Sequence, residues 1–348
     1  MKKLPWWLRD LMYLAVFVAI LLGITYGLDA VASVYPVMRY YNRILAMIGI
    51  NITLAVSLNI INGHAGQFSL GHAGFMGVGA YMSAALTFYT FAPIVAKYPE
   101  GSMQAWIAQN GLFLVAILAG GLVAAIAGYL VGLPSLRLRG DYLAIVTLGF
   151  GEIIRVIILN VDKVGAARGF SGIPTWANFF WVYFFCVMTI LISIRLVASS
   201  VGRAFLAIRE DEIAANAMGV DTTRFKVKAF VIGSFLAGVA GALFAHYPPA
   251  YLNPTAFTFL RSFDLVVMVV LGGLGSISGS IVAAVVLTYL QEGLRAFSEY
   301  RMVVYSLVLI ILMRTRPQGL LGRRELWDFL PKRKDTTAPE RDSGPAVD

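Results

Sequence analysis

Residues 112–133 read LFLVAILAGGLVAAIAGYLVGL, an uninterrupted run without one charged side chain. About 20 apolar residues in an α-helix cross the hydrocarbon core of a membrane, so this run predicts a transmembrane helix. The whole 348-residue chain has the same character, because 59% of its residues are hydrophobic, only 14% are charged, and the mean hydropathy is +0.76. Soluble domains average about 45–50% apolar and about 25% charged residues. The composition therefore excludes a soluble multidomain enzyme and predicts an all-α polytopic membrane protein.

Runs of this kind predict about ten transmembrane helices, and eight helices with re-entrant segments fit the pattern almost as well. The ten runs are 11–29, 44–61, 69–90, 112–133, 141–159, 178–196, 229–247, 258–272, 280–296 and 301–313. The first run follows basic residues and resembles a signal peptide. It is longer than the apolar region of such a peptide, roughly 7–15 residues, so we expect it to remain as the first helix.

The distribution of basic residues predicts how these helices are oriented. With the N-terminus in the cytoplasm, 19 of the 28 Lys and Arg residues fall in the segments on the inner side or, for Arg195, at its edge. Those segments are the N-terminal tail, 62–68, 134–140, 197–228, 273–279 and the C-terminal tail. Cytoplasmic loops of membrane proteins are rich in Lys and Arg, so both termini are predicted to be cytoplasmic. This placement also accounts for the net charge of +9 without a nucleic-acid partner.

The domain organisation follows from the same pattern. Residues 1–313 are predicted to form the transmembrane domain, with a large cytoplasmic loop at 197–228. Residues 314–348 lack apolar periodicity and are predicted to be a basic, disordered cytoplasmic tail. Its basic cluster sets the topology and can contact membrane lipid.

A polar, glycine-rich segment interrupts the second and third runs. Polar side chains in hydrocarbon are costly unless protein or water satisfies them, so they are expected to face the interior of the helix bundle. The glycines permit a break in the helix, and a broken helix at membrane depth can line a solute pathway. The alternative is tight helix packing with internally satisfied polar groups. The candidate pathway residues of this segment are Asn51, Asn59, His64, Gln67, Ser69 and His72.

Ionisable side chains in the runs add one more candidate. Glu152 and Arg155 lie three residues apart and can pair on one helix face, as can Arg261 and Asp264. Glu152 is a candidate pathway residue, although a structural ion pair explains it equally well. The single cysteine, Cys186, and three unclustered histidines predict no metal site, and no catalytic motif occurs.

The loop at 197–228 has the features of a docking helix. Glu210, Asp211 and Glu212 suit the first turn of a helix, where carboxylates meet the positive end of the helix dipole. Ala214 and Ala215 would give this helix a bare face, and Gly219 can end it in the left-handed conformation. Asp221 with the two threonines after it can cap the next helix. A helix of this kind favours docking into a protein groove over an ordinary amphipathic helix on the membrane surface.

Four blocks of the chain, in order, resemble the LivM-type permeases of branched-chain amino-acid ABC importers. The blocks are GQFSLGHA at 66–73, LRGDYLAIVTLG at 138–149, EIAANAMG at 212–219 and VLGGLGSISG at 270–279. The third block resembles the EAA loop that couples ABC permeases to their ATPase subunits. The resemblance extends from about Asn51 to Gly319. One departure is AARGFSGI at 166–173, where the family more often has a Thr-Gly-Gly start, and this leaves the substrate open.

The resemblance implies a subunit of a bacterial inner-membrane importer. It would work with a homologous LivH-type permease, two cytoplasmic ATPase subunits and a periplasmic amino-acid-binding protein. The chain lacks the Gly-x-x-x-x-Gly-Lys-[Ser/Thr] phosphate-binding loop, so it is predicted to be no enzyme and to bind no cofactor, with ATP used by its partners. The coupling residues implied by the resemblance are Arg209, Glu210, Asp211, Glu212, Ala214, Ala215 and Gly219.

Alternatives within this class are importers of urea, short amides or aromatic acids. An ion-coupled secondary transporter, with Glu152 and Asp264 as cation or proton ligands, is an alternative of a different class. A membrane enzyme is a third alternative, which the lack of a catalytic motif disfavours.

Overall fold

The structure, a computed structural model, describes residues 6–99, 101–135 and 141–294, together with isolated positions between 303 and 325. The described part of the chain is helical, and its β structure is confined to one isolated bridge between Phe170 and Leu252. Six of the described helices are long and apolar enough to cross a membrane. The prediction of an all-α polytopic protein is therefore confirmed, whereas the count of about ten stays a prediction. The run at 301–313 and the tail beyond it fall largely outside the described residues.

Twelve α-helices occur in the described residues. They are α1 (Trp6–Val34), α2 (Pro36–Asn59), α3 (His72–Leu86), α4 (Ala92–Val95), α5 (Met103–Ser135), α6 (Asp141–Leu159), α7 (Phe179–Ala198), α8 (Ser200–Glu210), α9 (Glu212–Ala217), α10 (Thr222–His246), α11 (Phe259–Gly272) and α12 (Ile277–Gly293). A π-helical turn, Ile60–His64, prolongs α2, and a second one, Thr87–Phe91, joins α3 to α4. Short 3-10 turns lie at Asp162–Val164, Ala166–Arg168 and Pro254–Phe257.

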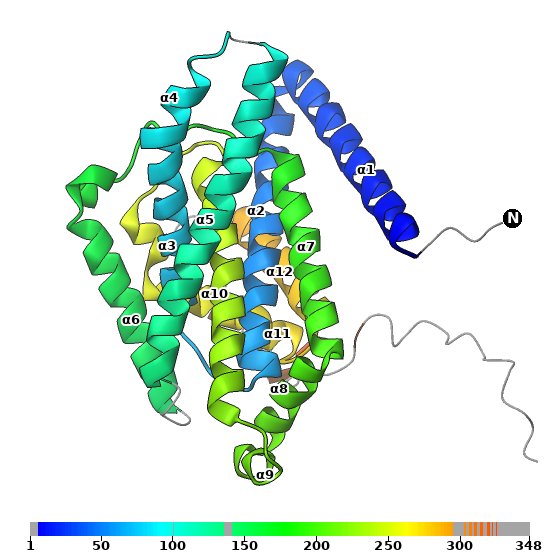
Figure 1. The fold of residues 1–348 in the computed structure, drawn as a ribbon, viewed down its shortest axis with the longest axis vertical. Coiled ribbons are helices and arrows are strands. Elements are labelled where there is room, and N and C mark those ends of the chain that lie inside the picture. The colour runs from blue at the N-terminus through cyan, green and yellow to red at the C-terminus, as the bar shows by residue number, and fades with distance from the viewer. Residues whose placement is uncertain are drawn as a thin grey trace, which may run out of the picture.

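The helices α2 and α10 form the centre of the bundle (Figure 1). Inside their apolar windows 83% and 72% of the residues are buried, against 22% for α6 and 28% for α7 at the periphery. Glycines let the central backbones approach closely. A Cβ at Gly79 of α3 would overlap the backbone of Gly238 in α10, and one at Gly120 of α5 would lie 2.7 Å from the carbonyl oxygen of Gly79. This packing of small residues is what the glycine-rich sequence of α3 predicts.

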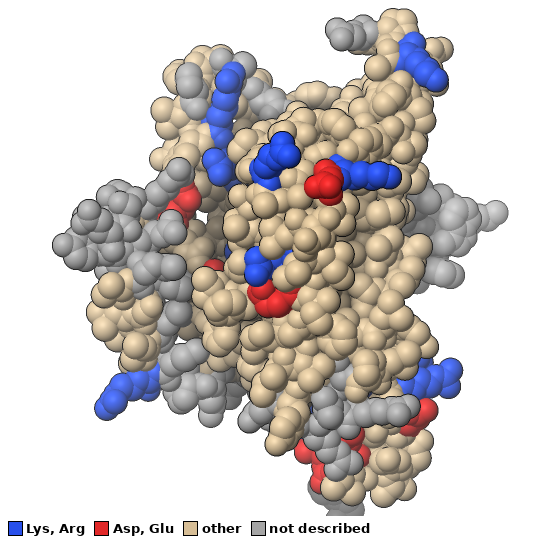
Figure 2. All heavy atoms as spheres, turned by 90° about the vertical axis from the view of Figure 1, so that its left-hand side faces the viewer, with Lys and Arg blue, Asp and Glu red and all other residues tan. Residues whose placement is uncertain are grey.

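The periphery is apolar where a soluble protein would be charged. Exposed residues of α6 include Tyr142, Ile145, Ile153 and Ile157. Figure 2 views the molecule from the side on which α6 lies, and most of the described surface on this face carries no charge. Such a surface suits contact with lipid or with another helical subunit.

Segments predicted to lie on one side of the membrane meet at one end of the bundle, the end that carries α9 (Figure 1). The loop after α2, the turn between α11 and α12, and the α8–α9 segment are in direct contact there, through Arg209 and Asn59. The short helix α4 lies at the opposite end. The alternation of ends matches the predicted topology, in which 62–68, 197–228 and 273–279 share one side.

Candidate functional site

The chain breaks between α2 and α3, as the glycine-rich sequence predicts. After the π turn that ends at His64, residues 65–71 run without a regular helix, and Gly66 adopts a positive φ of 66°. A Cβ at Gly66 would lie 2.8 Å from Cγ of Arg209 in α8. Glycine therefore serves two purposes at this position, since it permits the left-handed backbone and leaves space for α8.

A second break, the turn between α11 and α12, packs against the first. Asn59 at the end of α2 donates from Nδ2 to the carbonyl oxygen of Ser276 (2.9 Å), and its Oδ1 accepts from the backbone N–H of Gly275 (3.0 Å). Gly63 lies against the same two groups, because a Cβ there would overlap both the Asn59 amide and the Gly275 nitrogen. The buried Asn59 side chain therefore holds the end of α2 against the backbone of the α11–α12 turn.

The predicted docking segment is formed by two helices rather than one. Glu210 ends α8, and Asp211 adopts an extended conformation (φ −155°) and caps α9 by accepting from the backbone N–H groups of Ile213 (2.8 Å) and Ala214 (3.0 Å). The expectation that all three acidic residues share one first turn was therefore wrong. Local capping by Asp211 competes with helix continuation, so it divides the segment.

Arg209, the residue before this division, joins α8 to both breaks. Its Nη1 donates to the carbonyl oxygen of Gly63 (3.0 Å), and a Cβ on Gly275 would lie 2.7 Å from the same nitrogen. Its Nη2 pairs with the Glu210 carboxylate at 2.8 Å. The planar guanidinium can donate in several directions at once, which suits a junction of this kind. Arg209, His64, Gly275 and Glu325 also line a pocket of about 360 Å³.

The helix α9 presents an apolar outer face. Ile213 is 69% exposed and Met218, the C-cap of the helix, is 85% exposed, whereas Ala215 is buried. The prediction that Ala215 belongs to the bare outer face is therefore wrong, since the alanine packs inward. Ala214 is exposed as expected. Gly219 follows with φ +85°, so its predicted left-handed termination is confirmed.

An ion pair that the sequence did not reveal fixes α9 to α10. The ammonium of Lys226 lies 2.6 Å from the Glu212 carboxylate, and the Lys226 side chain is only 1% exposed while that of Glu212 is 28% exposed. A buried ammonium needs such a partner, because desolvation of an unpaired charge is costly. Asp221 caps α10 by accepting from the N–H of Arg224 (3.0 Å), as predicted.

The candidate pathway residues of the α2–α3 region are buried, and the structure satisfies most of them internally. Asn51 donates to Thr288 Oγ1 (2.8 Å) and accepts from Arg261, and His64 Nδ1 lies 3.1 Å from the carbonyl oxygen of Asn59. Gln67 donates to the carbonyl oxygen of Ala65 (3.1 Å), and the backbone N–H of Ser69 donates to Asn62. His72 Nε2 lies 2.8 Å from Ser57 Oγ, but its Nδ1 has no hydrogen-bond partner among the described residues. In this conformation the candidate pathway residues form hydrogen bonds inside the protein, around the break between α2 and α3.

Glu152 lies apart from that network. Its Oε2 pairs with Nε of Arg155 at 2.6 Å, as the spacing predicts, and its Oε1 accepts from the backbone N–H of Phe259 (3.1 Å). The carboxylate therefore ties α6 to the first turn of α11, where the positive end of the helix dipole favours an anion.

One further residue of this end was missed from the sequence. Glu325 accepts from the backbone N–H groups of Ile277 (2.8 Å) and Ser278 (2.9 Å), and also from the Ser278 hydroxyl. It thereby caps α12 from a distant part of the chain. A capping acid so far from its helix in sequence gives no local signal, unlike the capping Ser276 that immediately precedes α12.

The membrane-length helices, the paired breaks and the projecting α8–α9 segment define a multi-pass membrane protein of the permease type. The family of branched-chain amino acid transport system permease components matches residues 40–313, and the chain belongs to this family. No solved structure matches the chain.

The relatives of the chain agree with this assignment. The chain is 38% identical to the high-affinity branched-chain amino acid transport system permease protein LivM of Salmonella typhimurium over 327 residues, which cover 84% of this chain and 72% of the relative. It is 25% identical to a probable LivM permease of Methanocaldococcus jannaschii, covering 82% and 94% of the two chains. The LivH permease of Salmonella typhimurium is 34% identical over a shorter region, 47% of this chain and 53% of the relative. The resemblance expected from the four blocks is confirmed.

Proposed function

We propose that this chain is the LivM-type transmembrane subunit of an ATP-driven importer of branched-chain amino acids in a bacterial inner membrane. The observation that carries the coupling mechanism is Arg209, which connects the projecting α8–α9 segment directly to the two helix breaks. The names of the relatives supply the substrate class.

The proposed partners follow from the same assignment. A LivH-type permease completes the transmembrane unit, two ATPase subunits dock on the α9 end, and a periplasmic binding protein delivers the amino acid at the α4 end. Cofactor binding by this chain is not part of the proposal, since ATP is used by the ATPase subunits.

The α8–α9 segment is the proposed coupling element. The exposed face of α9, with Ala214, Ile213 and Met218, enters a groove of the ATPase. Asp211, Glu212 and Gly219 hold this face in place through the cap, the Lys226 ion pair and the left-handed turn. Ala215 supports it from inside.

Movement of α8 would then reach the breaks through Arg209. Pulling its guanidinium away from Gly63 loosens the contact between the α2 end and the α11–α12 turn, which Asn59 otherwise closes. We propose that Asn51, Asn59, His64, Gln67, Ser69, His72 and Glu152 act in this step. As the bundle opens, their internal hydrogen bonds are exchanged for contacts with the solute, water or rearranged helices.

Arg209→Gln tests this mechanism, with Arg203→Gln as the matched control, because Arg203 is an exposed arginine of the same helix. Amino-acid uptake should fall strongly in the first variant while ATPase subunits still copurify, since the docking face on α9 is unchanged. The control should retain both. Normal uptake with Arg209→Gln would refute the proposed transmission.

Orientation has its own test. Reporter fusions after Arg203 and Arg324 should report cytoplasm, and a fusion after Pro99 should report periplasm. A periplasmic signal after Arg203 would remove the α9 end from the ATPases and contradict the proposal. Competition of labelled leucine uptake by isoleucine, valine, urea, short amides and aromatic acids would separate the proposed substrate from its alternatives.

A further inference from the structure

A groove beside the coupling end has the chemistry of a lipid-binding site. It is an open pocket of about 570 Å³ between the end of α5 and the beginning of α10. We call it the α5–α10 groove, and it is lined by Tyr129, Leu133, Asp221, Thr223, Arg224, Val227, Lys228, Val231 and Ile232.

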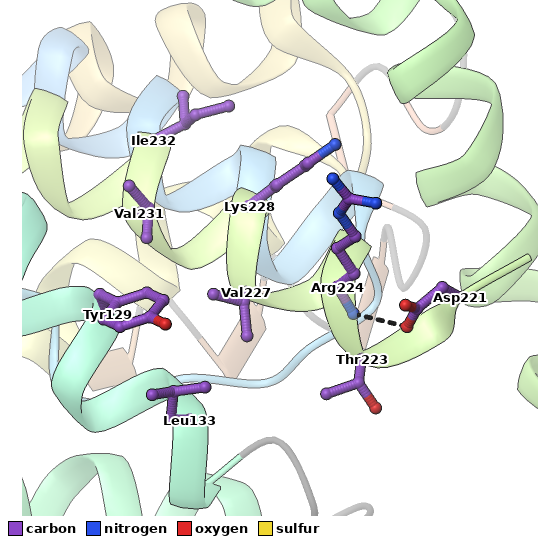
Figure 3. A pocket seen from close by; sticks show the side chains of 9 residues that line it. All are labelled: Tyr129, Leu133, Asp221, Thr223, Arg224, Val227, Lys228, Val231 and Ile232. Carbon is purple, nitrogen blue, oxygen red and sulfur yellow. Dashed lines mark hydrogen bonds between the residues drawn. The ribbon is translucent and has the colours of Figure 1, made fainter.

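The groove has an apolar wall and a basic end. Tyr129 and Leu133 of α5 face Val227, Val231 and Ile232 of α10, and Leu133 is 41% exposed in the chain alone. Arg224 and Lys228 lie four residues apart, on one face of α10, and Figure 3 shows both side chains extending in the same direction. The two charges therefore lie together at one end of the apolar wall of the α5–α10 groove.

The acid in the groove, Asp221, offsets only part of these charges. Asp221 is used as the cap of α10, accepting from the backbone N–H of Arg224, and Figure 3 marks this bond. The Lys228 ammonium lies 4.9 Å from the centre of the Phe225 ring, a contact that keeps its charge. Among the described residues no carboxylate forms an ion pair with either side chain. The first turn of α10 adds the positive end of its dipole.

The position of the groove, between two helices long enough to cross a membrane, favours a lipid as its ligand. Both walls belong to helices that are long and apolar enough to cross a membrane, Met103–Pro134 and Thr222–His246 within the α5 and α10 regions. The basic end lies in the first two turns of α10, at the N-terminal end of a helix long enough to cross a membrane, which is where a lipid headgroup would meet it. A soluble ATPase subunit would not cover an apolar wall at this depth.

We propose that the α5–α10 groove binds one anionic phospholipid, with the phosphate at Arg224 and Lys228 and an acyl chain along the apolar wall. The lipid would lie next to Asp221, the N-cap of α10, and would therefore stabilise the beginning of this helix. This proposal does not depend on the identity of the transported solute.

The test is native mass spectrometry of the full chain, purified in a mild neutral detergent and titrated with dioleoyl phosphatidylglycerol or dioleoyl phosphatidylcholine. The wild type should prefer the anionic lipid. The double variant Arg224→Gln/Lys228→Gln should lose about tenfold or more of this preference, the size expected for removing two charges at a membrane surface. The control Lys163→Gln/Arg168→Gln removes two charges from the α6–α7 connection and should keep the preference.

A second variant separates a lipid from a simple anion. Val231→Trp leaves both charges but fills the apolar wall, so it should weaken binding of the anionic lipid. Soluble glycerol 3-phosphate should compete poorly in the wild type, because it lacks the acyl chain. An unchanged preference in the double variant, or full competition by glycerol 3-phosphate, would overturn the proposal. Crosslinking of a Thr223→Cys variant to a protein subunit instead of a lipid would assign the groove to a protein interface and would also overturn the proposal.

Discussion

Gly219 gives a specific test of the coupling segment, because a substitution there acts through the backbone conformation of the turn. It follows α9 with φ +85°, and a Cβ placed there would meet no atom within 4 Å. The Cβ of Gly219→Val therefore meets no neighbour, while the substitution forces a β-branched residue into the left-handed region. That conformation costs an L-residue roughly 1–2 kcal/mol, and a β-branched residue lies at the upper end.

This conformational cost lowers the population of molecules in which α9 is in its docking position. If the strain is released by opening the turn, the ratio of molecules with α9 in its docking position to those with the turn open falls by about 5- to 30-fold. The apparent dissociation constant for the ATPase rises by up to the same factor, because only the competent fraction binds. Insertion of the protein should be unchanged, since the turn lies outside the apolar windows. Gly219→Asn should have a smaller effect, because Asn enters the left-handed region more readily.

The assay is the amount of ATPase subunit retained per permease over a range of ATPase concentrations, together with amino-acid uptake. Gly101→Val is the matched control. Gly101 has φ +78° and also has open space around its Cβ position, but it lies between α4 and α5 at the opposite end. Normal retention and uptake in Gly219→Val would refute the reasoning, because the loop would then be a passive linker. Equal losses of ATPase retention and uptake in Gly219→Val and Gly101→Val would also refute it, because backbone strain at either end of the bundle would then have the same effect.

Further predictions concern buried polar groups near the breaks. Lys226→Met should loosen α9, because it leaves Glu212 without its partner, and limited proteolysis after α9 should become faster while insertion stays normal. Glu325→Gln keeps the shape but removes the charge at the α12 N-terminus, so amide exchange at Ile277 should accelerate by a factor corresponding to about 1 kcal/mol. Replacing Gln67 or His72 by Leu should reduce uptake at normal protein levels, and unchanged uptake in both would assign them to packing alone.

Hydropathy predicted the fold well where helices are long and uninterrupted. The run at 112–133 lies within α5, and those at 141–159 and 178–196 match α6 and α7 within two residues. The predicted helix boundaries were wrong where polar residues continue a helix beyond its apolar run. The helix α2 begins at Pro36, whereas the apolar run begins at 44, because Pro36 is well placed at a helix start and the following polar residues remain helical.

The site was predictable only to the extent that its causes are local. The caps at Asp211 and Asp221 and the left-handed Gly219 follow from neighbouring residues, and the structure has all three. The inward orientation of Ala215 depends on how α9 packs. The Lys226 partner likewise depends on the packing of α9 against α10, although a lysine within an apolar helix was a signal that could have prompted a search for one.

The position of Arg209 explains why three separate sequence signals belong together. The glycines at 63, 66 and 275 are each weak indications alone, since helix packing or flexibility can account for any of them. In the structure, Arg209 donates to the carbonyl oxygen of Gly63, and its side chain borders the positions that a Cβ would take at Gly66 and Gly275. A side chain at Gly63 would displace the Asn59 amide, and one at Gly66 or Gly275 would displace Arg209. Gly66 and Gly275 therefore leave the space that Arg209 occupies, and Gly63 leaves the space for the Asn59 amide. Under the proposed mechanism, Arg209 transmits movement of α8 to both breaks. A substitution at Gly63 should consequently uncouple transport in the same way as Arg209→Gln, although the two residues are far apart in the chain.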